Sequence, residues 1–100
     1  MSSENTMLEK LRKQRDEILE LAARHGAANL RIFGSIARGE ESGGSDVDFL
    51  VEMEEGRSLL DLVGFVQDLE ELLECDVDVV TEGGLSPHLR DAILSEAVPL

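Results

Sequence analysis

Segments with helical periodicity alternate along this chain with short runs of β-branched residues, and this alternation constrains the fold more than any other feature. Ser58 and Ser86 stand where helix N-caps are expected, and Pro87 suits a first helical position. The expected elements are helix 3–25, strand 30–33, strand 46–52, helix 58–74, strand 75–80 and helix 86–97. This order predicts an α/β (α+β) fold in which helices flank a small mixed β-sheet.

The chain length predicts one domain. A chain of 100 residues buries roughly two-thirds of its unfolded surface, enough for a single core. We expect residues 1–100 to form this domain, with an N-terminal helix within 1–26, a central region at 30–80 and a C-terminal helix within 85–98. The second and third strands are joined through a helix, so they should lie parallel or one strand apart.

The charge balance excludes some partners. Asp and Glu number 22 against 9 Lys and Arg, giving a formal net charge of −13. Direct DNA binding is disfavoured because affinity for phosphate backbones comes from Lys and Arg. The apolar runs are shorter than the roughly 20 residues that span a membrane, and the first ten residues are not signal-like, so we expect a cytoplasmic protein.

Two acidic residues follow a glycine-serine pair after a gap of ten residues. Asp46 and Asp48 are two apart on a predicted strand, which places their side chains on one face with Cα atoms roughly 6.5–7 Å apart. Two carboxylates that converge repel each other by about 4 kcal/mol at 4 Å when the effective dielectric constant is near 20. A compensating cation is therefore expected, and oxygen ligands of this kind suit Mg²⁺.

A third carboxylate could come from the strand at 75–80. Asp76 and Asp78 point to the same side of that strand, and neighbouring strands lie about 4.8 Å apart. Asp78 lies deeper in the strand, so it is the first choice, with Asp76 as the alternative. Three such acids could hold two metal ions roughly 3.5–4 Å apart.

The glycine-serine pair has the features of a phosphate-binding turn. Gly34 permits close backbone approach, Ser35 offers a hydroxyl, and Arg38 can add charge-assisted hydrogen bonds to a triphosphate. Taken alone, Ser35 would be interpreted as a helix cap and Arg38 as a surface residue. The segment lacks the lysine of a P-loop, and Leu50 occupies a position where an EF-hand loop requires an oxygen ligand.

The runs G-S-I-A-R-G-E and S-D-V-D-F-L-V resemble those of the nucleotidyltransferases of the DNA polymerase β superfamily. The short chain is most similar to the minimal nucleotidyltransferases, or MNT domains, which are encoded beside HEPN-domain proteins in prokaryotes. The resemblance implies the nucleotidyltransferase fold, Mg²⁺ as cofactor and ATP or another NTP as substrate. It also implies phosphate binding by Gly34, Ser35 and Arg38. Metal binding and catalysis would fall to Asp46, Asp48 and Asp78.

The same resemblance implies a partner and an activity. MNT domains act as antitoxins that transfer AMP to a tyrosine of a HEPN ribonuclease toxin, so a HEPN toxin is the expected partner. A second hypothesis is a non-catalytic antitoxin that neutralises the toxin by occlusion, its acidity matching a basic surface.

The helix at 58–74 has a broader apolar arc than one buried stripe requires, because Leu60, Phe65 and Leu72 lie outside the main face. One interpretation is burial against the sheet. The other is a surface for a partner or for a second copy in a homo-oligomer.

Overall fold

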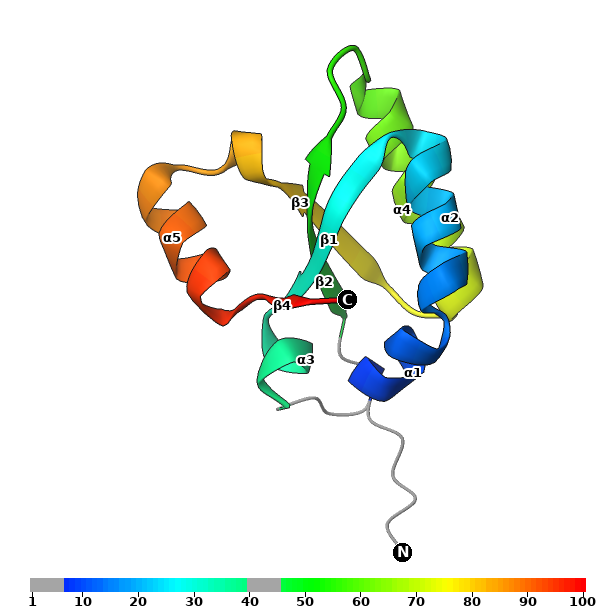
Figure 1. The fold of residues 1–100 in the computed structure, drawn as a ribbon, viewed down its shortest axis with the longest axis horizontal. Coiled ribbons are helices and arrows are strands. Elements are labelled where there is room, and N and C mark those ends of the chain that lie inside the picture. Colours follow the sequence, from blue (N-terminus) through cyan, green and yellow to red (C-terminus); the bar gives the residue numbers. More distant parts are fainter. Residues whose placement is uncertain (1–6, 40–45) are drawn as a thin grey trace, which may run out of the picture.

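The computed structural model describes residues 7–39 and 46–100 (Figure 1). The predicted helical residues 3–6, and residues 40–45 between the predicted strands at 30–33 and 46–52, lie outside this described part. In chain order the elements are α1 (Met7–Lys13), α2 (Arg15–His25), β1 (Ala27–Phe33), α3 (Ser35–Arg38), β2 (Val47–Met53), α4 (Leu59–Leu73), β3 (Val77–Thr81), the 3-10 helix η1 (Glu82–Gly84), α5 (Pro87–Glu96) and β4 (Val98–Pro99).

The four strands form one mixed sheet in the order β3-β2-β1-β4. β1 pairs antiparallel with both β2 and β4, whereas β2 and β3 run parallel. The parallel pair is joined through α4, as the sequence predicts. The α/β fold class, a small mixed sheet with flanking helices, is confirmed.

The single helix predicted over 3–25 is wrong, because the described part of this segment forms two helices that break at Gln14. The Gln14 N–H donates to the carbonyl oxygens of Lys10 and Leu11 at 3.2 and 3.1 Å, and its own carbonyl accepts from Ile18 at 2.9 Å. Leu11 on α1 and Ile18 on α2, on either side of the break, are both fully buried. The apolar recurrence is also interrupted at this point in the sequence.

Several strand boundaries differ from the predicted ones. β1 begins at Ala27 instead of residue 30, directly after Gly26, whose φ of +77° ends α2. Asp46 and Asp76 each come one residue before a strand, not inside it. β4 was not predicted, because two residues that include Pro99 carry no periodicity.

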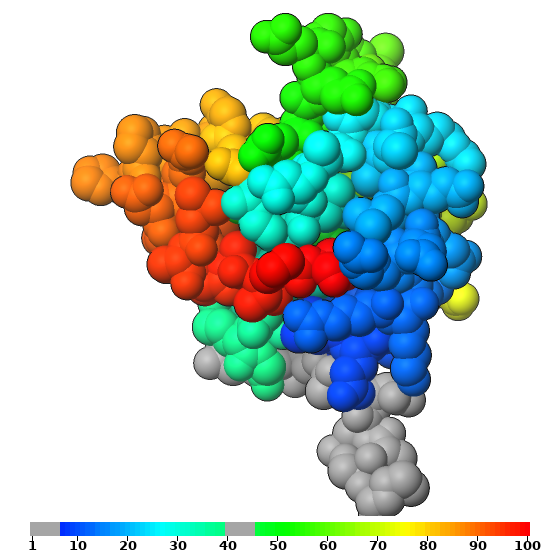
Figure 2. Space-filling view, in the orientation of Figure 1, coloured from blue at the N-terminus to red at the C-terminus, as the bar shows by residue number. Residues whose placement is uncertain are grey.

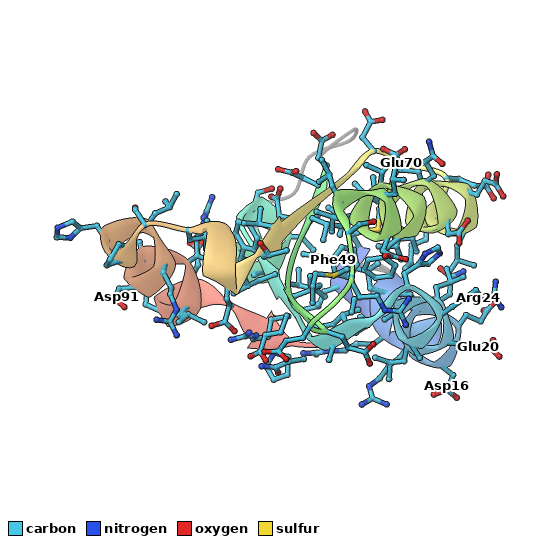
Figure 3. The ribbon with its side chains drawn as sticks, turned by 90° about the horizontal axis from the view of Figure 1, so that it is seen from above. Asp16, Glu20, Arg24, Phe49, Glu70 and Asp91 are labelled. Atoms are coloured by element: carbon cyan, nitrogen blue, oxygen red, sulfur yellow. The ribbon has the colours of Figure 1, made fainter. Side chains whose placement is uncertain are left out.

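One face of the sheet packs on helices to make the core. Val47, Phe49 and Val51 of β2 alternate toward this face and are completely buried with Phe65 of α4. Figure 3 shows Phe49 between the sheet and the helices α2 and α4. Burying each such large side chain contributes about 1.5–3 kcal/mol.

The intervening residues of β2 point to the second face, which carries Asp48 and Leu50. α5 lies on this side, across the sheet from α2 and α4 (Figures 1 and 3). Glu82 of η1 fixes it there by accepting hydrogen bonds from Arg31 of β1 and from Arg90 of α5, the latter at 3.3 Å. No helix within the described ranges is long and apolar enough to cross a membrane.

Some residues of the broad apolar arc of α4 are buried and others are exposed, so each interpretation of the arc is supported by part of it. Phe65 is fully buried, which agrees with packing against the sheet, whereas Leu60 is 80% exposed beside the exposed Leu59. The helix start is as predicted, because the Ser58 hydroxyl accepts the Leu60 N–H at 3.2 Å and Asp61 accepts the Ser58 N–H at 3.0 Å.

Candidate active site

Two aspartates on adjacent strands form the centre of the site. Asp48 of β2 and Asp78 of β3 are direct register partners in the parallel pair. Register partners on neighbouring parallel strands project from the same face, about 4.8 Å apart. Asp48 is half-buried and Asp78 is exposed. The sheet therefore places two carboxylates side by side on its second face.

The other two candidate acids lie just before the first residues of β2 and β3. Asp46 and Asp76 precede the register partners Val47 and Val77, and both are exposed. The Asp76 carbonyl oxygen accepts the Val47 N–H at 3.1 Å, so the backbone joins the beginnings of the two strands. Asp78, unlike Asp76, is in register with Asp48.

The electrostatic environment of Asp48 disfavours its charge. Burial raises the pKa of its carboxyl above the ordinary value of 3.8, and the negative charges of Asp78, Asp46 and Glu96 raise it further. The Arg38 guanidinium acts in the opposite direction and lowers this pKa. A carboxylate held among like charges in this way is a site that a bound cation would stabilise.

The glycine-serine bend lies directly against Asp48. Gly34 follows β1 with φ +78° and ψ −155°, a conformation open to glycine but not to residues with a Cβ. A Cβ at Gly34 would overlap a carboxylate oxygen of Asp48 and lie 3.3 Å from its Cγ. The absent side chain therefore lets the backbone bend approach the acid.

Ser35 and Arg38 begin and end the short helix that follows the bend. Gly34, not Ser35, occupies the N-cap position, and among the described residues no side chain caps this helix. Ser35 is partly buried and the Arg38 side chain is 45% exposed. α3 therefore brings a backbone N–H, a hydroxyl and a guanidinium to the same corner of the sheet as Asp48.

Glu96, the last residue of α5, is a site residue that the sequence did not indicate. Its carboxylate accepts the Gly34 N–H at 3.1 Å and two hydrogen bonds from Arg38 at 2.9 and 3.0 Å. In Figure 2 the C-terminal segment, in red, lies against α3, in green-teal. No sequence motif surrounds Glu96, and the pairing of β4 with β1 two residues later helps to bring it to the bend.

The donor chemistry of the site fits Mg²⁺, because the converging groups are carboxylate oxygens. Asp48 and Asp78 supply the neighbouring pair, and the charge of Asp46 reaches Asp48. Within the described residues, no group of three or more His, Cys, Asp or Glu side chains is already gathered as a metal site. The two register partners are thus the part of the donor set that the fold positions by itself.

A mixed sheet with acids on adjacent strands, facing a glycine-serine bend, defines the nucleotidyltransferase class of fold and site. The sequence profile of the nucleotidyltransferase domain family matches residues 10–100. The chain belongs to this family.

Two relatives illustrate the similarity. A Methanocaldococcus jannaschii protein provisionally named a protein adenylyltransferase is 49% identical over 82 residues, covering 82% of this chain and 88% of the relative. The protein adenylyltransferase MntA of Thermococcus cleftensis is 40% identical over 79 residues, covering 79% and 80%.

Solved structures share the fold. One described provisionally as a minimal nucleotidyltransferase has a TM-score of 0.85 and 52% identity, covering 99% of this chain and all of that one. A structure of the toxin-antitoxin MntA-HepT has a TM-score of 0.66 at 19% identity, covering 88% and 69%, and shows likeness of fold alone.

Proposed function

We propose that this protein transfers AMP from ATP to a hydroxyl group of a partner protein in a Mg²⁺-dependent reaction. The observation that carries the proposal is the register of Asp48 with Asp78, beside the bend at Gly34. Membership of the nucleotidyltransferase family and similarity to protein adenylyltransferases support the reaction type.

In this proposal the aspartates bind the metal ion, and the bend with α3 binds the nucleotide phosphates. Asp46 and Asp48 would hold Mg²⁺, assisted by Asp78. When bound, the metal supplies positive charge that stabilises the entering and leaving oxygens. The Gly34 N–H, the Ser35 hydroxyl and the Arg38 guanidinium would bind the phosphates of the nucleotide.

The proposed reaction is an in-line displacement. The acceptor oxygen attacks the α-phosphorus, a new oxygen–phosphorus bond forms, and the bond to the bridging oxygen breaks to release pyrophosphate. Asp78 orients the acceptor hydroxyl and takes its proton. Its exposed position on β3 leaves its carboxylate open to an incoming hydroxyl group.

The partner we propose is a HEPN-domain toxin, with a tyrosine hydroxyl as acceptor. This proposal is supported by the similarity to MntA and by the fold shared with the toxin-antitoxin MntA-HepT. The net charge of −13 would favour a basic partner surface.

The direct test is to incubate the protein with Mg²⁺, ATP labelled on its α-phosphate and a HEPN-domain protein encoded beside it. We expect label on the partner protein, loss of labelling with EDTA, and loss when the acceptor tyrosine is replaced. Absence of label with all four ribonucleotides would contradict the proposal.

Asp78 in β3 and Asp76 just before it provide a matched comparison. Asp78→Asn should lower the transfer rate by roughly 10²- to 10⁴-fold, the range for loss of a general base, while Asp76→Asn should change it by less than about threefold. Both substitutions remove one negative charge from an exposed residue near the same strand. Measured rates in the opposite order would assign the third acid to Asp76.

A further inference from the structure

We infer that Glu96 occupies the nucleotide-phosphate position in the free protein, so that a triphosphate must displace its carboxylate in order to bind. This inference rests on the proposed function of the bend at Gly34 and of α3. It gives the last helix a part in nucleotide binding and makes Glu96 a residue that sets nucleotide affinity.

The contacts of Glu96 are those an anionic ligand would make. One carboxylate oxygen accepts both the Gly34 N–H and an Arg38 hydrogen bond, and the other accepts from the same Arg38 nitrogen. A backbone N–H and a guanidinium also bind phosphate oxygens, with similar donor geometry. The Gly34 N–H has a single hydrogen, so full binding of a phosphate oxygen there requires Glu96 to withdraw.

Glu96 also brings a negative charge to the face of the sheet that carries Asp48. Its carboxylate lies close enough to Asp48 to raise the pKa of that residue, so it adds negative charge to a face that already carries Asp46 and Asp78. Its hydrogen bonds to Arg38 and Gly34 offset this repulsion. Once a nucleotide supplies those donors with phosphate oxygens, the favourable contacts of Glu96 are lost and the repulsion remains.

The fold allows Glu96 to leave without rearranging its helix. β4 pairs Val98 with Ile32 of the sheet, and the Arg90 side chain donates to Glu82 of η1, so the chain is held on both sides of Glu96. The Glu96 side chain is 30% exposed and can rotate toward solvent. A ligand with several negative charges competes best with one carboxylate, which favours a triphosphate over the monophosphate AMP.

The test measures binding of α,β-methylene-ATP with Mg²⁺ by titration calorimetry, since this analogue cannot be cleaved between the α and β phosphates. Glu96→Gln should bind about threefold to tenfold more tightly than the wild-type chain, because the competing ion pair is removed. Asp91→Asn is the matched control. It removes the same charge from the exposed side of α5 (Figure 3) and should leave the affinity unchanged.

The possible outcomes separate the two proposals. Equal or weaker binding by Glu96→Gln, with measurable binding by the wild type, overturns the inference and makes Glu96 a support for Arg38. No nucleotide binding by any variant overturns the proposed function and this inference together.

A second measurement uses the wild-type protein alone. The ¹³C signal of the Glu96 carboxyl should move toward its solvent-exposed value as the analogue is added. An unchanged Glu96 signal at saturation overturns the displacement even if the substituted chain does not fold.

Discussion

Replacing Asp48 with asparagine is expected to lower AMP transfer by about a thousandfold or more, because it removes a carboxylate from the proposed metal-binding pair. Asn has nearly the same shape, so the close contact with the Gly34 bend is preserved. Asp91→Asn on α5 serves as the charge-matched control and should retain full activity. Initial rates of label transfer to the partner at saturating ATP measure the effect.

The same substitution should make the fold more stable at neutral pH. The pKa of Asp48 is raised in the folded protein, first by burial and then by Asp78 and Asp46, so the folded state binds this proton more tightly than the unfolded state. The resulting penalty is absent below the unfolded pKa and grows as pH rises through the folded pKa.

Asp48→Asn should therefore raise the free energy of unfolding by about 0.5–1 kcal/mol at pH 7, a figure reduced for solvent screening, and should change it little near pH 3.5. Urea unfolding across this pH range measures the difference. Lower stability at pH 7 would contradict the electrostatic description of the site.

A stable but inactive variant also tests the alternative function, in which the protein neutralises the toxin by occlusion. If the double variant Asp46→Asn with Asp48→Asn still protects cells from the toxin, occlusion and not AMP transfer is the antitoxin activity.

Replacing Gly34 with alanine is the second change for which we expect a large effect. Its φ of +78° and ψ of −155° lie in a region that only glycine adopts freely, and a Cβ would overlap the Asp48 carboxylate. Backbone strain and overlap together should lower the free energy of unfolding by about 2–4 kcal/mol. Transfer activity should fall as well, because relief of the overlap moves either the bend or the acid.

Gly39→Ala is the matched control. Gly39 ends α3 with φ +72° and ψ +20°, in the left-handed helical region, and a Cβ there meets no atom of the described residues within 4 Å. Alanine at this position should cost about 1–2 kcal/mol and leave transfer nearly unchanged. Thermal unfolding and transfer rates should be measured for both glycine variants. Equal losses of stability and of activity in the two would contradict a role in transfer for the close approach of Gly34 to Asp48.

The sequence predicted those parts of the structure that local signals determine. Ser58 and Ser86 cap their helices as expected, and the strand that carries Asp48 was found from its β-branched and aromatic residues. The helix between β2 and β3 predicted that these strands lie parallel or one strand apart, and they pair directly in parallel. The nearness of Asp48 to Asp78 then depends on a register that only the folded sheet provides.

Other features depend on contacts between distant segments, which periodicity does not report. Leu11 of α1 and Ile18 of α2 lie in one core on either side of the break at Gln14, and β4 pairs with the edge of β1 that β2 leaves open. Glu96 reaches Gly34 across 62 residues of sequence by way of that pairing. Local patterns could identify the aspartates and the bend, but not Glu96, whose carboxylate accepts the Gly34 N–H.

Alternate residues of β2 face opposite sides of the sheet, so a single strand carries both core residues and a residue of the site. Val47, Phe49 and Val51 pack in the core, whereas Asp48, between two of them, lies half-buried on the second face and is not part of that core cluster. Substitution of Asp48 should therefore change the chemistry of the site while the core packing of β2 is kept, whereas Leu50 on the same face is completely buried and does not share this freedom.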